Sequence, residues 1–359
     1  MSGNTHGATH IEARSLRCKE RQRLQSIIPL STPFAIYIDP ANACNFHCTF
    51  CPTAYPDLLK KVGRPKGLMK MELFRKIVED LKEFDKRLKI ANLYKDGEPL
   101  LNRDFPEMVR YLKDADVVDR IWTKTNGALL KPELNEKLAN CGLDMICISV
   151  EAVSSEGYKQ VAGANIDYVT FKQNVRDLYE RTKTTKLYVK IADTGLSELE
   201  ARQFFDDFQS TCSYISIEKL MGWSNSSVKD FRLGTRSDTY DGLPLTPKLV
   251  CPYPFYTLAV NFDGSVSLCC ADWAHDTVVG NAATESLRQI WEGERLYEFR
   301  KMMLEGRRNS NRACGDCHYI QVAPDNIDAH RGELLERIRR QHQASSEITL
   351  PDEGSGSKE

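Results

Sequence analysis

The sequence lacks three features that would point to particular classes of protein. No run of residues approaches the roughly 18 consecutive apolar residues of a membrane-spanning helix. The first thirty residues are polar and lack the apolar core of a signal peptide. The 49 basic residues nearly balance the 50 acidic ones, so the net charge of −1 gives no electrostatic basis for binding nucleic acid. We therefore expect a cytoplasmic protein with neither a membrane nor a nucleic acid as its partner.

Cysteine, by contrast, is frequent: the 359 residues include 12 cysteines. Without an export signal, so many thiols fit a reducing compartment, where cysteines serve metals or catalysis more often than disulfides. Hydrophobic residues make up 41% of the chain and charged residues 28%, which is typical of a folded protein. The length predicts two domains, or one large domain with an extension.

Three cysteines lie close together near the N-terminus with the spacing C-x3-C-x2-C: Cys44, Cys48 and Cys51. Three thiolates so arranged can hold three irons of a 4Fe–4S cluster and leave the fourth iron open to another ligand. The alternative is a structural zinc site, which usually has four ligands. His47 could be the fourth ligand, but it lies between two of the cysteines, where the geometry for joint coordination is poor.

The middle of the chain alternates predicted strands with predicted helices. Six such units follow one another, from a strand at 34–38 to a strand at 214–220. This succession implies parallel strands with helices outside, and therefore an α/β fold. A Gly/Ser/Asp-rich connection follows. After it we expect a β-hairpin with strands at 256–260 and 265–268 and Asp-Gly in its turn, and then one long helix at about 285–304.

Polar residues follow several of the predicted strands, at the edge where parallel α/β folds bind their ligands. The motifs are D-G-E-P after the second strand, T-N-G after the third and S-x-E at the end of the fourth, with a lysine on the fifth. Taken alone, the first two are common turn signals, and the lysine could be an outward-facing charge. The residues are Asp96, Gly97, Glu98, Asn126, Ser149, Glu151 and Lys190.

Four further cysteines occur in the C-terminal third: Cys251, Cys269, Cys314 and Cys317. The predicted hairpin and helix would bring the pair Cys251 and Cys269 close to the pair Cys314 and Cys317, giving four thiolates for one site. This pattern also suits tetrahedral zinc. Cys270 is left over, and because neighbours in a strand point to opposite faces, we expect only Cys269 to be a ligand.

The N-terminal cysteine loop, with Phe50 before its third cysteine, and the motifs at the strand ends resemble the radical S-adenosylmethionine (SAM) superfamily. The resemblance covers roughly residues 33–320 and implies a partial (β/α)6 TIM-like barrel. It implies a 4Fe–4S cluster on the first three cysteines, with SAM on the open iron, from which a 5′-deoxyadenosyl radical forms and abstracts hydrogen from substrate. It places Phe50 beside adenine, the main chain at 96–98 beside the SAM amino group, Ser149 and Glu151 near the ribose, and Lys190 near the carboxylate. Asp96 stands where glycine is common in the family.

The C-terminal cysteines resemble those of the twitch domain, a shortened SPASM domain with one auxiliary 4Fe–4S cluster. With four candidate ligands we expect a fully ligated cluster, suited to electron transfer. Two 4Fe–4S clusters and SAM are thus the expected cofactors. The expected organisation begins with an N-terminal extension (1–32), the radical SAM core (33–221) and a linker (222–250). A small α+β twitch/SPASM-like domain (251–325), a C-terminal helix (326–344) and a disordered tail (345–359) follow.

The chain most resembles the 2-deoxy-scyllo-inosamine dehydrogenase type of radical SAM enzyme. This resemblance implies oxidation of a secondary alcohol of a sugar, aminocyclitol or sugar nucleotide to a ketone, with the auxiliary cluster as electron acceptor and a flavodoxin- or ferredoxin-type protein as electron donor. The alternatives are an epimerase or dehydratase, in which Cys270 could return a hydrogen atom, a peptide maturase, and a non-enzymatic scaffold with two zinc sites. Further catalytic candidates, chosen by position, are Glu218, Lys219, Arg232 and Arg236.

Overall fold

The computed structural model describes residues 9–10, 22–220, 222–224, 239, 244–315 and 317–348. The candidates Arg232 and Arg236 and most of the predicted linker lie outside the described residues. So does the predicted tail beyond residue 348. Among the described residues, no helix is both long and apolar enough to cross a membrane.

Six consecutive parallel strands form the centre of one ten-stranded sheet, whose order is β1-β7-β6-β5-β4-β3-β2-β8-β9-β10. A short strand, β1 (Thr9–His10), adds to β7 in parallel. The arrangement confirms the predicted α/β fold with a partial barrel. The six strands are β2 (Ala35–Ile38), β3 (Ile90–Asn92), β4 (Ile121–Thr125), β5 (Met145–Val150), β6 (Lys186–Asp193) and β7 (Tyr214–Lys219).

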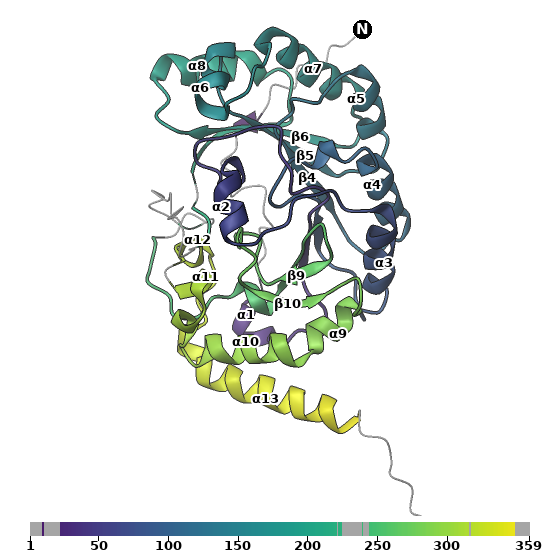
Figure 1. Cartoon of the computed structure of the whole chain (residues 1–359), viewed down its shortest axis with the longest axis vertical. Helices are drawn as coiled ribbons and strands as arrows, with labels where there is room; N and C mark the ends of the chain where they lie inside the picture. Colours follow the sequence, from purple (N-terminus) through teal and green to yellow (C-terminus); the bar gives the residue numbers. More distant parts are fainter. Residues whose placement is uncertain are drawn as a thin grey trace, which may run out of the picture.

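Helices follow the strands and cover the outside of the sheet, as Figure 1 shows for α3, α4, α5 and α7. In α3, the apolar residues at helical spacing are buried, including Phe74, Ile77 and Val78. The helix α6, which the sequence analysis missed, begins at the N-cap Ser154 and ends at Gly163, whose φ is +57°. The helices of this part are α1 (Leu24–Ile27), α2 (Pro56–Lys61), α3 (Met71–Leu81), α4 (Phe105–Asp114), α5 (Pro132–Ala139), α6 (Ser155–Ala162), α7 (Tyr168–Arg181) and α8 (Glu198–Phe208).

The C-terminal third continues the sheet of the barrel. Strand β8 (Thr257–Val260) pairs in parallel with β2, and β9 (Ser265–Ser267) and β10 (Val278–Asn281) follow in antiparallel order. The hairpin between β8 and β9 confirms the prediction, and Gly264 in its turn has a φ of +90°. The loop after β9 is thereby held close to the strand ends of the barrel.

The prediction of one long helix at 285–304 was wrong. The segment forms α9 (Leu287–Glu292) and α10 (Glu294–Leu304), separated at Gly293, whose extended backbone (φ −74°, ψ 160°) starts the second helix. A Cβ at this position would lie 2.6 Å from the carbonyl oxygen of Gln289, so the tight break requires glycine. The last helices are α11 (Arg312–Gly315), α12 (Tyr319–Val322) and α13 (Arg331–Ile348), which runs past the predicted end at residue 344.

A buried aspartate fastens the C-terminal third to the barrel on the side of α3. The Asp80 carboxylate accepts hydrogen bonds from Lys76 Nζ (2.8 Å) and from the backbone N–H of Leu287 (3.2 Å). Lys76 Nζ also donates to the carbonyl oxygen of Glu285 at 3.0 Å. This contact joins α3 to the start of α9.

Candidate active site

The first cysteine loop lies between β2 and α2, at the carboxyl end of the parallel strands. Cys48 is buried, Cys44 and Cys51 are partly buried, and all three are free thiols. Burial raises the pKa of Cys44 to about 12, and the neighbouring Cys51 adds to this effect. The backbone N–H of Phe46 points at Cys44 Sγ, 3.4 Å away. Three neighbouring thiols with an N–H group aimed at one sulfur fit a cationic iron–sulfur cluster, which binds thiolates.

Gly97 allows the end of β3 to pack directly on this loop. A Cβ at this position would lie 2.3 Å from the carbonyl oxygens of both Ala41 and Ala43. The next residue, Glu98, donates its backbone N–H to the Ala43 carbonyl oxygen at 2.8 Å. The main chain at 96–98 therefore packs directly against the cysteine loop. The resemblance predicted that this main chain contacts SAM.

The side chains of Glu98 and Asn126 link the ends of β3 and β4 to the first cysteine loop. The Glu98 carboxylate accepts hydrogen bonds from the Thr125 hydroxyl and the Asn126 N–H, both at 2.7 Å. Burial raises the pKa of Glu98 to about 7, although these hydrogen bonds act against the shift. Asn126 Nδ2 donates to Asn45 Oδ1 at 2.8 Å and lies 3.8 Å from Cys44 Sγ. Asn126 thus contacts the cysteine loop directly, and Glu98 holds Asn126 in place.

A cavity of about 340 Å³ opens above the strand ends and reaches the loop after Cys269. It brings together many of the residues that the sequence predicted, from five separate segments. Asp96, Gly97, Glu98 and Asn126 do not line it. The predicted residues that do are Phe50, Ser149, Glu151, Lys190, Glu218, Lys219 and Cys270.

The two carboxylates of the cavity differ in their electrostatic surroundings. Glu218 accepts hydrogen bonds from Lys190 Nζ (2.6 Å) and the Tyr188 hydroxyl (2.5 Å). Burial disfavours its charge, but Lys190, Lys124 and these hydrogen bonds outweigh burial and lower the pKa of Glu218 to about 2. Burial raises the pKa of Glu151 to about 7, with the same two lysines acting against the shift. Glu151 is therefore the better proton acceptor near neutral pH.

The four C-terminal cysteines face one another across a second, smaller cavity of about 30 Å³. Burial raises the pKa of Cys251 to about 12, and Cys317 adds to this effect. The backbone N–H of Ala271 points at Cys269 Sγ, 3.3 Å away. Arg308 also lines this cavity, and its Nη1 donates to the carbonyl oxygen of Cys314. Four thiols, an N–H directed at sulfur and an adjacent cation fit a fully ligated cluster.

Cys269 and Cys270 face different cavities, but not for the predicted reason. Strand β9 ends at Ser267, so neither cysteine belongs to a strand and the alternation of strand side chains does not apply. Cys269 lines the small cavity with the other three cysteines, whereas Cys270 lines the large one. Cys270 Sγ lies 3.7 Å from the Tyr319 hydroxyl. The turn after β9 thus presents one thiol to each cavity.

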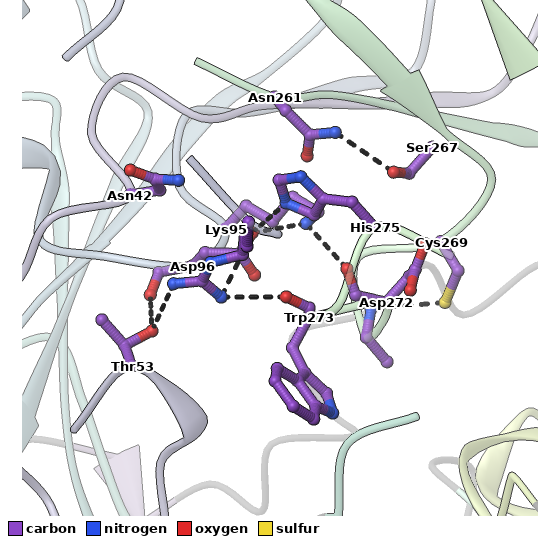
Figure 2. A network of polar contacts seen from close by, with 12 residues as sticks. Asn42, Thr53, Lys95, Asp96, Asn261, Ser267, Cys269, Asp272, Trp273 and His275 are labelled. Carbon is purple, nitrogen blue, oxygen red and sulfur yellow. Dashed lines mark hydrogen bonds and ion pairs between the residues drawn. The ribbon is translucent and has the colours of Figure 1, made fainter. Parts of the chain in front are cut away.

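Asp96 turns away from the large cavity and is the centre of a buried polar network, shown in Figure 2. Its carboxylate lies 2.6 Å from Lys95 Nζ and 2.9 Å from His275 Nε2. Sequence analysis assigned no role to Lys95 or His275, and no local pattern could have shown it, because His275 lies 179 positions beyond Asp96. Lys124, which lines the large cavity, was also missed.

Comparisons with known proteins identify the two parts of the chain. Residues 38–202 match the family model of the Radical SAM superfamily, and residues 251–318 match SPASM, an iron–sulfur cluster-binding domain. The chain therefore contains a radical SAM domain and a SPASM-type domain, as its sequence predicted. The radical SAM domain binds a 4Fe–4S cluster and SAM, and SPASM domains bind additional iron–sulfur clusters.

Curated relatives share part of the sequence. The chain is 36% identical to the probable GTP 3',8-cyclase of Methanococcus maripaludis (strain C7) over 141 residues, which are 38% of this chain and 42% of that protein. It is 26% identical to the GTP 3',8-cyclase of Staphylococcus saprophyticus over 223 residues, 57% of this chain and 62% of that protein. The chain thus spans less than two thirds of the length of these relatives.

Solved structures share the fold. BtrN in complex with AdoMet and 2-DOIA aligns with a TM-score of 0.51 and 20% identity, covering 79% of this chain and 92% of BtrN. Streptococcus suis SuiB bound to S-adenosylmethionine aligns with a TM-score of 0.59 and 16% identity, covering 83% of this chain and 74% of SuiB. At these identities the likeness establishes the fold alone.

Proposed function

We propose that this enzyme oxidises a secondary alcohol of a hydroxylated small molecule, such as a sugar, aminocyclitol or sugar nucleotide, to a ketone. The observation that carries the proposal is the single cavity shared by the two cysteine regions. Phe50 of the first cysteine loop and Cys270, next to the auxiliary cysteine Cys269, line the same space. A substrate bound there would lie near both the site of hydrogen abstraction and an electron acceptor.

The proposed ligands are Cys44, Cys48 and Cys51 for the first cluster and Cys251, Cys269, Cys314 and Cys317 for the second. When bound, the first cluster with SAM supplies a 5′-deoxyadenosyl radical, and the second offers a one-electron acceptor. The alcohol must then lose one hydrogen atom from carbon, one proton from oxygen and one electron, which together leave a C=O bond. We assign the proton to Glu151, because its pKa of about 7 suits a general base.

The low pKa of Glu218 argues against the predicted role of this residue as the base. Its ion pair with Lys190 also bears on the predicted contact between Lys190 and the SAM carboxylate, because that lysine already has a carboxylate partner 2.6 Å away. We propose that Lys190 and Glu218 act as a pair that orients polar groups of SAM or substrate. Phe50 and Ser149 remain proposed SAM contacts, whereas Glu151, which the resemblance placed near the ribose, is here assigned to the substrate alcohol.

A second candidate function follows from the names of the relatives. Lys124, Lys190 and Lys219 line the large cavity and could bind the phosphates of a nucleotide such as GTP. The sequence similarity to GTP 3',8-cyclases makes cyclisation of GTP the alternative to test first. Epimerisation or dehydration, with Cys270 as hydrogen donor, and peptide modification are further alternatives.

The test is an anaerobic assay of the reconstituted enzyme with SAM, a reductant or a flavodoxin- or ferredoxin-type donor, and a panel of sugars, aminocyclitols, sugar nucleotides and GTP. We expect 5′-deoxyadenosine formation to depend on a hydroxylated substrate, with a product two electrons more oxidised. Cys270→Ala should keep most of this activity. If the product in D2O instead carries deuterium at carbon without a change in oxidation level, the enzyme is an epimerase and Cys270 is its hydrogen donor. Turnover of GTP alone would favour the cyclase.

A further inference from the structure

Buried polar contacts to the end of β3 and to the segment after α2 fasten the loop after Cys269 and Cys270 to the barrel. Lys95, at the end of β3, donates from Nζ to the carbonyl oxygen of Asp272 at 3.1 Å. Arg64 donates from Nη1 to the carbonyl oxygen of Trp273 at 3.0 Å. His275 extends from the same loop back to Asp96 (Figure 2). Three consecutive parts of the loop are therefore held from the barrel side.

The Asp96 carboxylate is the common partner of these groups. The side chains of Asp96 and Lys95 have no exposed surface, and that of His275 is 8% exposed. Arg64 Nη1 lies 3.9 Å from Asp96 Oδ2. Burial opposes ionisation of Asp96, but Lys95, Arg64 and His275 outweigh it and hold the pKa of this carboxyl below its usual range. Asp39 is a second buried carboxyl that interacts with Lys95 and Arg64, and without Asp96 it would be the counter-charge left to these two cations.

The same network reaches the first cysteine loop. The Thr53 hydroxyl, two positions after Cys51, donates to the carbonyl oxygen of Asp96 at 2.7 Å. It also accepts a hydrogen bond from Arg64 Nη2 at 3.0 Å. Asp96 and its partners therefore contact the first cysteine loop and the loop after Cys269 and Cys270.

The conformation of His275 indicates that these contacts determine the shape of the loop. Its φ is +57°, in the left-handed region that is uncommon for residues with a Cβ. Such a conformation persists where surrounding contacts hold it. The Asp272 carboxylate adds to these contacts by accepting from the N–H groups of Asp276 (3.1 Å) and Thr277 (2.8 Å).

We propose that Asp96 and His275 are positioning residues that join the two cysteine loops and fix the turn that presents Cys269 to one cavity and Cys270 to the other. The aspartate at 96, where the family commonly has glycine, thus has a partner in the C-terminal domain. The inference rests on the proposed function for the role of the second cluster, but the bridge itself is independent of it.

The experiment compares His275→Ala, His275→Gln, Asp96→Asn and the unaltered holoenzyme. Asp80→Asn is the matched control, because Asp80 is also a buried aspartate that joins the barrel to the C-terminal third, at α3 and α9. Two quantities are measured: hydrogen–deuterium exchange of residues 271–277, and the rate at which EDTA removes iron from the cluster whose electron paramagnetic resonance signal does not respond to SAM.

In His275→Ala and Asp96→Asn, the amide hydrogens of residues 271–277 should exchange faster than in the unaltered enzyme. EDTA should also remove iron from the SAM-insensitive cluster at least about tenfold faster, which is the size of effect known for residues that support metal ligands. His275→Gln keeps a side-chain N–H donor and should restore both rates, while Asp80→Asn should match the unaltered enzyme. Unchanged exchange in His275→Ala overturns the inference, as does an equal effect in Asp80→Asn. If Asp96→Asn fails to fold, the two His275 variants decide. If the unaltered enzyme holds no second cluster, the proposed function fails, and the exchange rates still decide the bridge.

Discussion

The packing of Gly97 against the first cysteine loop makes a sharp prediction for Gly97→Ala. The added Cβ would lie 2.3 Å from two carbonyl oxygens, those of Ala41 and Ala43. Both are backbone atoms, so no flexible side chain can move aside, and the cysteine loop or the end of β3 must shift. Insertion of a methyl group into such a contact costs about 1–3 kcal/mol, and we expect the upper end of this range.

With about 2.1 cal/mol/K of unfolding entropy per residue, 1 kcal/mol corresponds to about 1.3 °C in Tm for 359 residues, so Gly97→Ala should lower Tm by roughly 4 °C. The displaced loop should also bind SAM more weakly and hold less iron in the first cluster. Thermal unfolding, iron content and SAM binding by isothermal titration calorimetry measure these effects on the reconstituted enzyme.

The matched control is Gly332→Ala in the helix α13. No atom lies within 4 Å of a Cβ added at Gly332, and alanine favours a helix over glycine by up to about 1 kcal/mol. Its Tm should therefore be unchanged or higher, with normal SAM binding. If Gly97→Ala retains the Tm and SAM affinity of the unaltered enzyme, the close contact between the strand end and the cysteine loop is wrong.

Three further predictions concern the chemistry. Replacing all three N-terminal cysteines by alanine should remove about half of the iron and all cleavage of SAM, measured as 5′-deoxyadenosine, because one of two clusters is lost. Replacing Cys314 and Cys317 should leave SAM cleavage measurable but abolish substrate oxidation; normal turnover would exclude an electron-accepting second cluster. Glu151→Gln should lower oxidation by about 100-fold or more. In the unaltered enzyme, the rate should rise with pH through about 7, because the base must be deprotonated. Glu218→Gln should keep this pH dependence, because its pKa of about 2 leaves Glu218 ionised throughout; the same pH profile in Glu151→Gln would contradict the assignment.

The sequence predicts those parts of the fold and site that depend on local patterns. The six βα units are read from apolar periodicity, and the first cysteine loop from the spacing of three thiols within eight residues. The break at Gly293 was missed because apolar residues occur on both sides of it, although the buried ones of α9 and of α10 do not share one helical face. The close approach to Gln289 is visible only in three dimensions.

Long-range polar pairing is the part that the sequence could not give. Asp96 reads as a turn residue, yet its side chain is buried against Lys95 and His275. The pKa values of Glu151 and Glu218 differ because Lys190 bonds one carboxylate and not the other. Such differences depend on which side chains the strand ends bring together, and strand order alone does not specify them.

The most direct test of the central claim is the metal content of the anaerobically reconstituted enzyme, with electron paramagnetic resonance before and after addition of SAM. Two 4Fe–4S clusters on seven cysteines predict about eight irons per chain and two reduced-cluster signals, of which SAM changes only one. About four irons with zinc bound at the C-terminal cysteines would contradict the account, because the substrate electron would then have no acceptor.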